Sequence, residues 1–346
     1  MSATTGRIVM WQLLVGICAA IALLFFLRDI LMPFFVALVL IALIDGLVRA
    51  LARTWPSGPR WALIVLTGVI IVALLIGCVT ALVFGCAKLV DVGPAVVERL
   101  DMLLNDAYRA VGAGQPPRLA ELVSAEAVMS VVTPVVSGLG NLLASATLVA
   151  LFMGFMLASR PLLVKKIDFL AGAPDRAVKF RRVLEQIARG AGDYMWVQTV
   201  TGVIYAGACG IALAFIGLDN VLFWTVLIFL LSFIPVLGAG VASIAPALFA
   251  LIQFPTYWQA IAVFVAVQIF ASIVGNVVLP NMQADKQNLD PTVSIFAIAL
   301  WTLLWGVTGA FLAIPLTVML MVVFDQFDET RWAAILISND GKPNAV

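Results

Sequence analysis

The strongest constraint in this sequence is a stretch of 65 residues, Asn220–Ala284, that contains no Asp, Glu, Lys or Arg. A membrane-spanning helix needs about 20 consecutive apolar residues, so this stretch alone is long enough for two or three membrane passes. The chain holds six further charge-free runs: Ile8–Leu27, Ile30–Ile44, Trp61–Ala87, Ala127–Ser159, Tyr194–Leu218 and Thr292–Phe324. We therefore predict an all-α polytopic membrane protein with about eight hydrophobic helical elements.

The overall composition excludes several classes of protein. Of the 346 residues, 63% are hydrophobic and 11% are charged, and the net charge is +1, whereas about a quarter of the residues of a soluble domain are charged. This excludes a soluble enzyme and a protein that binds nucleic acid through a basic face. Because the chain has no His and no nucleophile motif, we predict no enzymatic activity, no catalytic residue, no cofactor and no metal site.

The distribution of Lys and Arg predicts which loops face the cytoplasm, since cytoplasmic loops are richer in these residues. Residues 45–60 carry three basic residues against one acid, residues 160–193 carry eight against four, and residues 88–126 carry four against six. We therefore place 45–60 and 160–193 inside, 88–126 outside, and the N-terminus inside. This N-terminal placement assumes that Ile8–Ile44 forms a helical hairpin that turns near Arg28–Asp29.

The same patterns predict six regions along the chain. Apolar residues at helical spacing indicate an amphipathic helix over Lys88–Arg109 and a helical hairpin that breaks near Gly172–Pro174. The hairpin around Gly172–Pro174 either lies on the lipid headgroups or docks a partner. The regions are an N-terminal transmembrane scaffold (1–87), an extracytoplasmic helical region (88–134), a transmembrane helix (135–159), a cytoplasmic helical loop (160–193), a transmembrane transport core with broken helices (194–325) and a C-terminal tail (326–346).

Helix-breaking residues concentrate in two of the apolar runs near the C-terminus. Proline removes a backbone donor and glycine loosens a helix, and freed backbone groups in lipid must be satisfied inside a bundle or beside a cavity. Paired interrupted segments are a sequence pointer to the binding site of a transporter. We therefore predict broken or re-entrant helices that form a transport path. Their breakers are Pro235, Gly238, Gly240, Pro246, Gly306, Gly309 and Pro315.

Two details of these runs refine the prediction. Gly240 and Pro246 have the same spacing as Gly309 and Pro315, which is weak evidence for an internal repeat. Between the two runs, Gln268, Ser272 and Asn276 recur at every fourth residue and would share one face of a helix. These side chains either line a path for a neutral polar solute or hydrogen-bond between helices as packing contacts.

The C-terminal third carries four motifs in a characteristic order: Phe233–Gly240 with Pro246, Gly275–Pro280, Leu289–Pro291 and Leu303–Leu316. Together they resemble the autoinducer-2 exporter family of bacterial inner-membrane proteins, also called PerM-type permeases. In this family an acidic residue usually precedes the proline that matches Pro280, and here that position is Leu279.

The resemblance implies a multi-pass permease of the bacterial inner membrane that exports a small polar solute such as autoinducer-2. It also implies contact with membrane lipids, a homo-oligomer with a pentamer suggested, and Pro280 as part of the site. Some members are linked to sodium–proton exchange, which suits a run without any carboxylate poorly. Two alternatives stay open: an ion-coupled sodium/proton antiporter, and a pore or non-transporting membrane scaffold.

Overall fold

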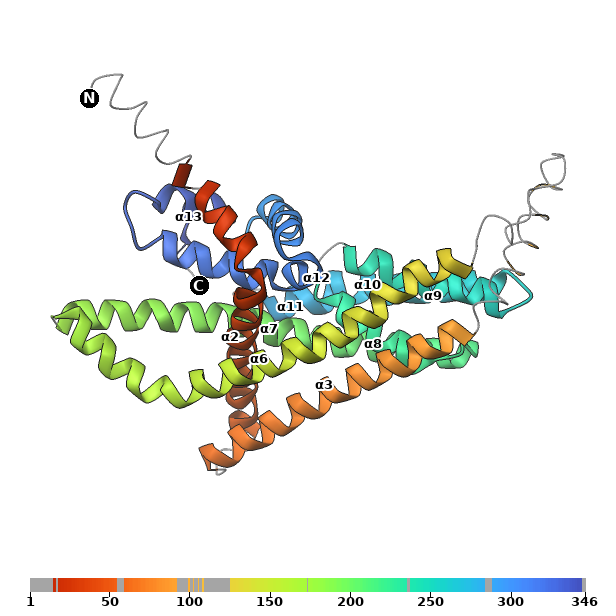
Figure 1. Cartoon of the computed structure of the whole chain (residues 1–346), viewed down its shortest axis with the longest axis horizontal. Coiled ribbons are helices and arrows are strands. Elements are labelled where there is room, and N and C mark those ends of the chain that lie inside the picture. The colour runs from red at the N-terminus through yellow and green to blue at the C-terminus, as the bar shows by residue number, and fades with distance from the viewer. Residues whose placement is uncertain are drawn as a thin grey trace, which may run out of the picture. The chain divides into compact units, whose positions relative to one another are not determined.

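A computed structural model describes residues 15–16, 18–54, 59–91, 99, 102, 105, 108, 125–172, 174–234, 237–283 and 288–343. Within these ranges the chain is helical and has no β-strand, which confirms the predicted all-α class. The helices are α2 (Arg28–Thr54), α3 (Arg60–Asp91), α6 (Ala125–Ala171), α7 (Pro174–Ile216), α8 (Val221–Ser232), α9 (Leu237–Gln253), α10 (Trp258–Ile273), the π-helix η1 (Val274–Val278), α11 (Leu279–Gln283), α12 (Pro291–Phe324) and α13 (Arg331–Ile337) (Figure 1).

Six stretches in the described part of the chain are long and apolar enough to cross a membrane. Two further apolar helices are shorter, α8 with 12 residues and α9 with 17. At 1.5 Å per residue these two helices are about 18 and 26 Å long, less than the roughly 30 Å of the hydrocarbon core. The six stretches are Arg28–Arg49, Val65–Lys88, Ser145–Leu163, Asp175–Ile216, Trp258–Met282 and Pro291–Phe324.

The chain folds as two compact units. The first is built from Met1–Gly46, Ser145–Met195 and Asp285–Val346, and the second from Leu47–Ala144 and Trp196–Ala284. Three long helices, α2, α6 and α7, contribute residues to both units. The six regions predicted from the sequence stay a prediction.

In the first unit, the side chains of α12 form much of the core, where Leu312, Ala313 and Met321 are fully buried. The Phe34 ring of α2 packs edge-on against Phe152 of α6, with ring centroids 5.7 Å apart. Phe35 packs at the same centroid distance against Trp305 of α12. Aromatic pairs of this kind bury large apolar areas and fix how the helices meet.

The chain reversal predicted near Arg28–Asp29 is wrong. The backbone amides of Leu27 and Leu31 donate to the carbonyls four residues earlier, so the chain continues in a helical path with a bend (Figure 1). At this bend the Leu24 carbonyl accepts a hydrogen bond from the Trp305 indole at 3.0 Å. A tertiary partner that the sequence does not indicate therefore shapes this segment, and α2 continues unbroken to Thr54.

The break predicted near Gly172–Pro174, between two helical arms, is confirmed. Helix α6 ends at Ala171, Gly172 adopts a left-handed φ of +61°, and α7 begins at Pro174. An ion pair between Asp168 and Arg181 joins the two arms. Glycine with φ above zero and proline at the first helical position are the residues that such a reversal favours.

In the second unit, neighbouring helices pack in the order α3–α8, α8–α9 and α9–α10. Helix α7 lies against α8 at two glycines that leave room for close approach. A Cβ at Gly202 would be 2.6 Å from the Ser232 hydroxyl, and one at Gly210 would be 3.2 Å from the Thr225 methyl. Most of the amphipathic helix predicted over Lys88–Arg109 lies outside the described residues.

Candidate transport hairpins

The first interrupted segment folds into a helical hairpin. Helix α8 ends at Ser232, α9 begins at Leu237, and the two helices pack on one another. After the break, the amide of Gly238 donates to the Ile234 carbonyl at 2.9 Å. A Cβ on Gly238 would lie 2.8 Å from the Leu231 carbonyl carbon, closer than real Cβ contacts come, so only glycine fits. Pro235 lies outside the described residues.

The two ends of this hairpin are tied together at its base. The Gln253 side chain, at the end of α9, donates to the Gly217 carbonyl at 2.9 Å and accepts from the Asp219 amide at 2.7 Å. Asn220, which holds a left-handed φ of 60°, donates from its side chain to the Gly85 carbonyl of α3. One polar side chain therefore closes the base, and a second fixes it to α3.

Arg99 caps the end of α9. Its guanidinium donates to the carbonyls of Pro255 at 2.6 Å, Phe254 at 3.3 Å and Leu251 at 3.4 Å. The last carbonyls of a helix lack intrahelical partners and carry partial negative charge, so a planar cation with several donors suits them. Arg99, which belongs to the region predicted to lie on the extracytoplasmic side, is thus fixed to the base of the α8–α9 hairpin.

The 34-residue apolar segment α12 also folds as a hairpin of two helical halves. Gly306 has φ 63° and ψ −144°, which interrupts the helix. The Trp301 indole donates to the Thr317 hydroxyl at 3.3 Å. In a straight helix these residues, 16 positions apart, would be about 24 Å from one another. The chain must therefore reverse at Gly306, so the two halves of α12 lie side by side.

The base of the α12 hairpin supports the same conclusion. The amide of Asp290, just before α12, donates to the Ile337 carbonyl at 3.0 Å, which lies only 13 residues beyond Phe324. A straight α12 would separate its ends by about 50 Å. The connection through α13, with seven helical residues, reaches about 30 Å at most. The two ends of α12 therefore lie near each other.

The two hairpins share a close backbone approach just after the break. A Cβ on Gly309 would be 2.6 Å from the Trp301 carbonyl carbon, which matches the situation of Gly238. The glycine spacing had paired Gly240 with Gly309, but Gly240 has open space around its α-carbon. The prolines do correspond, because Pro246 and Pro315 are both fully buried inside the second arm of their hairpin.

The predicted polar row does not form one regular helical face. Gln268 and Ser272 lie on α10, but Asn276 lies in the π-helix η1, and all three side chains are exposed. A π-turn takes an extra residue and is frequent at functional sites. Pro280 follows in α11 and is exposed as well. In this chain the row therefore faces away from the packed core of its unit.

The predicted site residues are divided between the two units. Gly238, Gly240, Pro246 and the polar row belong to the second unit, whereas Gly306, Gly309 and Pro315 belong to the first. None of the predicted site residues within 220–284 has a side chain that carries a charge. Among the described residues no group of three His, Cys, Asp or Glu side chains could hold a metal ion.

Comparison with known proteins assigns this architecture. Residues 13–329 match the AI-2E family transporter family. The chain belongs to this family. It is 24% identical over 324 residues to the AI-2 transport protein TqsA of Escherichia coli K12, an alignment that covers 92% of both chains. It is also 24% identical to the putative transport protein YhhT of the same strain, over 66% of this chain and 64% of YhhT.

A third relative matches a shorter part. The putative permease PerM of Escherichia coli K12 is 31% identical over 87 residues, which is 24% of each chain. As a member of the AI-2E family, the chain is a multi-pass membrane transport protein and not an enzyme. The family resemblance drawn from the C-terminal motifs is thereby confirmed.

Several residues that shape the hairpins of this AI-2E transporter were not predicted from the sequence. Gln198 of α7 donates to the Ser232 carbonyl at the α8 break, where the helix ends and leaves this carbonyl in need of a partner. Gln198 is the single amide side chain in the apolar run Tyr194–Leu218, and this isolation was a signal in the sequence that could have identified it. No such signal marks Arg99 or Thr317, because their hydrogen-bond partners lie far away in the sequence.

The start of α12 is set by local chemistry. The Asp290 carboxylate accepts from the backbone amides of Thr292 at 2.7 Å and Val293 at 3.1 Å, and Pro291 occupies the first helical position. These are the features of a strong N-cap. The hydrogen bond from Val293, followed by those from Thr292, holds the pKa of Asp290 below its ordinary value.

Proposed function

We propose that this transporter exports a small, uncharged polar solute across the bacterial inner membrane, along a path formed by its broken helices. The observation that carries the proposal is that both apolar segments reverse at a break and return to a closed base. Interrupted apolar segments in a transporter expose backbone groups and half-helix ends that can bind a solute.

The lack of charge in 220–284 supports a neutral solute. An ionic substrate or a coupled proton usually requires an intramembrane carboxylate or base, and this segment holds only amides and hydroxyls. A polyhydroxylated molecule needs hydrogen bonds but no counter-ion. The relative TqsA is an AI-2 transport protein, which agrees with this class of solute.

The Arg99 contact also supports a topology in which the α8–α9 hairpin enters the membrane from the outer face. Arg99, in the region that we place outside, caps the base of the α8–α9 hairpin. One apolar crossing, Trp258–Met282, separates that base from the base of α12. The α12 base would then face the cytoplasm, and each hairpin would be re-entrant. This would make the two segments inverted repeats, as in many secondary transporters.

A second contact supports the cytoplasmic side. Arg160 of α6 donates to the Asp45 carboxylate of α2 at 3.0 Å, which joins the two regions that the Lys and Arg count places inside. In this proposal residues 45–60 and 160–193 face the cytoplasm. The cytoplasmic placement of the N-terminus is untested and no longer has this support, because the reversal near Arg28 on which it depended is absent. A homo-oligomer, with a pentamer favoured by the family resemblance, also belongs to the proposal.

Solute flux in proteoliposomes tests the proposal. Vesicles with purified protein are loaded with labelled autoinducer-2, and efflux is measured with and without imposed proton and sodium gradients. We expect saturable efflux above that of protein-free vesicles. The absence of protein-dependent efflux would refute export of this solute, and a steady single-channel current without saturation would identify a pore. Proton efflux driven by sodium would identify an antiporter.

A further inference from the structure

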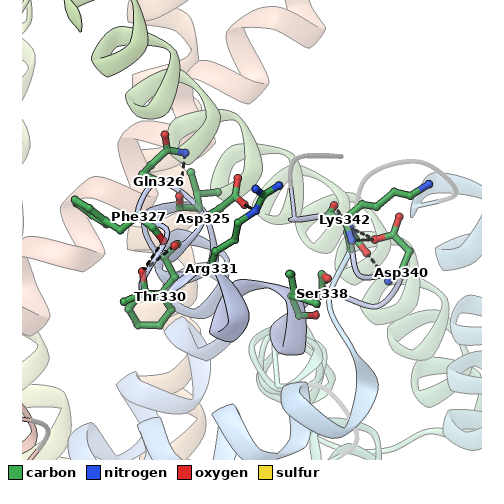
Figure 2. A network of polar contacts seen from close by, with 12 residues as sticks. Asp325, Gln326, Phe327, Thr330, Arg331, Ser338, Asp340 and Lys342 are labelled. Atoms are coloured by element: carbon green, nitrogen blue, oxygen red, sulfur yellow. Dashed lines mark hydrogen bonds and ion pairs between the residues drawn. The ribbon is translucent and has the colours of Figure 1, made fainter. Parts of the chain in front are cut away.

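The short helix α13 connects the two ends of the α12 hairpin. On one side, Arg331 at the start of α13 pairs with Asp325, the residue that follows α12, at 3.6 Å (Figure 2). On the other side, the Ile337 carbonyl at the end of α13 accepts from the Asp290 amide. Seven helical residues thus bridge the segment that leaves α12 and the segment that enters it.

The contact at the far end of α13 is a network around Asn288. Its side chain donates to the Asp340 carboxylate at 2.6 Å and to the Lys342 carbonyl at 2.8 Å. Its side-chain oxygen accepts from the amides of Asn339 at 3.1 Å and Asp340 at 3.2 Å. One amide side chain therefore satisfies four groups, which fixes residues 339–342 against the chain that leads into α12.

Asp325 is the unusual member of this arrangement. Its side chain is only 4% exposed, whereas that of Arg331 is 55% exposed. The oxygen Oδ1 makes no hydrogen bond, so the Arg331 guanidinium is the partner that compensates its charge. A buried carboxylate without a counter-ion is strongly unfavourable. Asp325 therefore depends on Arg331, and Arg331 in turn fixes the start of α13.

We propose that α13 is a staple across the base of the α12 hairpin, and that Asp325 and Arg331 are positioning residues for transport. The inference rests on the proposed function, because it assigns the α12 hairpin to the path. Without the pair, α13 would detach from Asn288 and Asp290, so the two halves of α12 would no longer be fixed at their ends. Solute binding would persist, but the turnover step that needs an intact hairpin would slow.

The test compares Arg331→Gln with Arg331→Lys, which keeps the charge. Arg331 is half-exposed, so its substitution leaves a foldable chain and water softens the loss. Asp325→Asn removes the buried charge itself, and Asp328→Asn, on an exposed side chain three residues away, is the matched control. Two quantities are measured for each full-length variant: backbone hydrogen exchange over 288–290 and 339–342, and KM and kcat for efflux.

We expect Arg331→Gln to raise exchange at both segments about tenfold and to lower kcat by a similar factor with KM unchanged. Arg331→Lys should recover most of both effects, and Asp328→Asn should match the wild type. Exchange that is unchanged at 288–290 would show that α13 is no staple. Raised exchange with normal kcat would exclude the positioning role. If the wild type shows no efflux, the proposed function fails, while the exchange data still decide whether α13 is a staple.

Discussion

The most informative single substitution is Gly309→Ala, because it adds one methyl group at the closest backbone approach in α12. The added Cβ would lie 2.6 Å from the Trp301 carbonyl carbon and 3.0 Å from the Trp305 Cβ. Carbon atoms prefer separations of about 3.5–4.0 Å, so the two halves of the hairpin must separate by about 1 Å. Both neighbours are backbone or β-carbon atoms, which cannot move away by a simple rotamer change.

The cost of this separation can be estimated from its parts. Overpacking in a well-packed core costs about 1–3 kcal/mol. The Trp301–Thr317 hydrogen bond, which crosses the hairpin at 3.3 Å, contributes about 0.5–1.5 kcal/mol that would be lost or weakened. Alanine returns up to about 1 kcal/mol through its higher helix propensity. The expected net loss is therefore about 0.5–4.5 kcal/mol in the free energy of unfolding.

Gly154→Ala is the matched control, because Gly154 is helical, has open space around its α-carbon and lies outside the predicted transport path. There the same methyl group should stabilise the protein by about 0.5–1 kcal/mol. The free energy of unfolding is measured by SDS titration in mixed micelles, and efflux is measured in proteoliposomes. Opposite signs for the two variants, with efflux reduced only in Gly309→Ala, are expected. Equal signs, or undiminished efflux in Gly309→Ala, would refute the hairpin geometry.

Three further outcomes follow from the contacts. Arg99→Gln should lower the efflux rate about tenfold, and Arg99→Lys should lower it less because lysine keeps the positive charge, although it reaches fewer of the three carbonyls; equal rates in both would remove the capping role. Asp290→Ala should lower the stability measured in unfolding titrations through loss of the N-cap, whereas Asp290→Asn should lower it less. Hydrogen bonds from the Lys342 amide and Asn288 hold the pKa of Asp340 below its ordinary 3.8. The ionised Asp340 carboxylate therefore stabilises the fold above pH 3.8, and this contribution is lost as the pH falls below that value. Asp340→Asn should accordingly flatten the fall in thermal stability below about pH 4.

The sequence was sufficient to locate most of the local structure. The breakers of the two apolar runs predicted the interruptions, and both segments are in fact hairpins. Gly172 and Pro174 correctly marked the reversal between α6 and α7, because φ above zero and a fixed φ are properties of single residues. Charge-free length likewise predicted the apolar helices, since burial in lipid is decided by composition over about 20 residues.

Contacts between distant segments were not predictable in this way. The bend near Arg28 depends on the Trp305 indole, 281 positions from its acceptor, and no local pattern reports such a partner. The glycine spacing selected Gly240, although the close approach falls at Gly238, because which glycine meets a carbonyl depends on the angle of the returning helix. The polar row failed for a similar reason, since the π-helix shifts Asn276 from the regular face.

The two hairpin bases are closed by different chemistry, and this difference bears on how such a transporter could alternate. The α8–α9 base depends on two neutral hydrogen bonds that the Gln253 side chain donates and accepts, together with the cap by the half-buried Arg99. The α12 base adds a buried carboxylate that requires its partner. Neutral bonds can exchange with water at modest cost, whereas separating a buried charge from its counter-ion is far less favourable. If one hairpin opens during transport, the α8–α9 base is therefore the one expected to yield first, and hydrogen exchange at 217–219 should exceed that at 288–290 during turnover. The reverse order would show that the ion pair, and not the amide base, is the mobile end of the path.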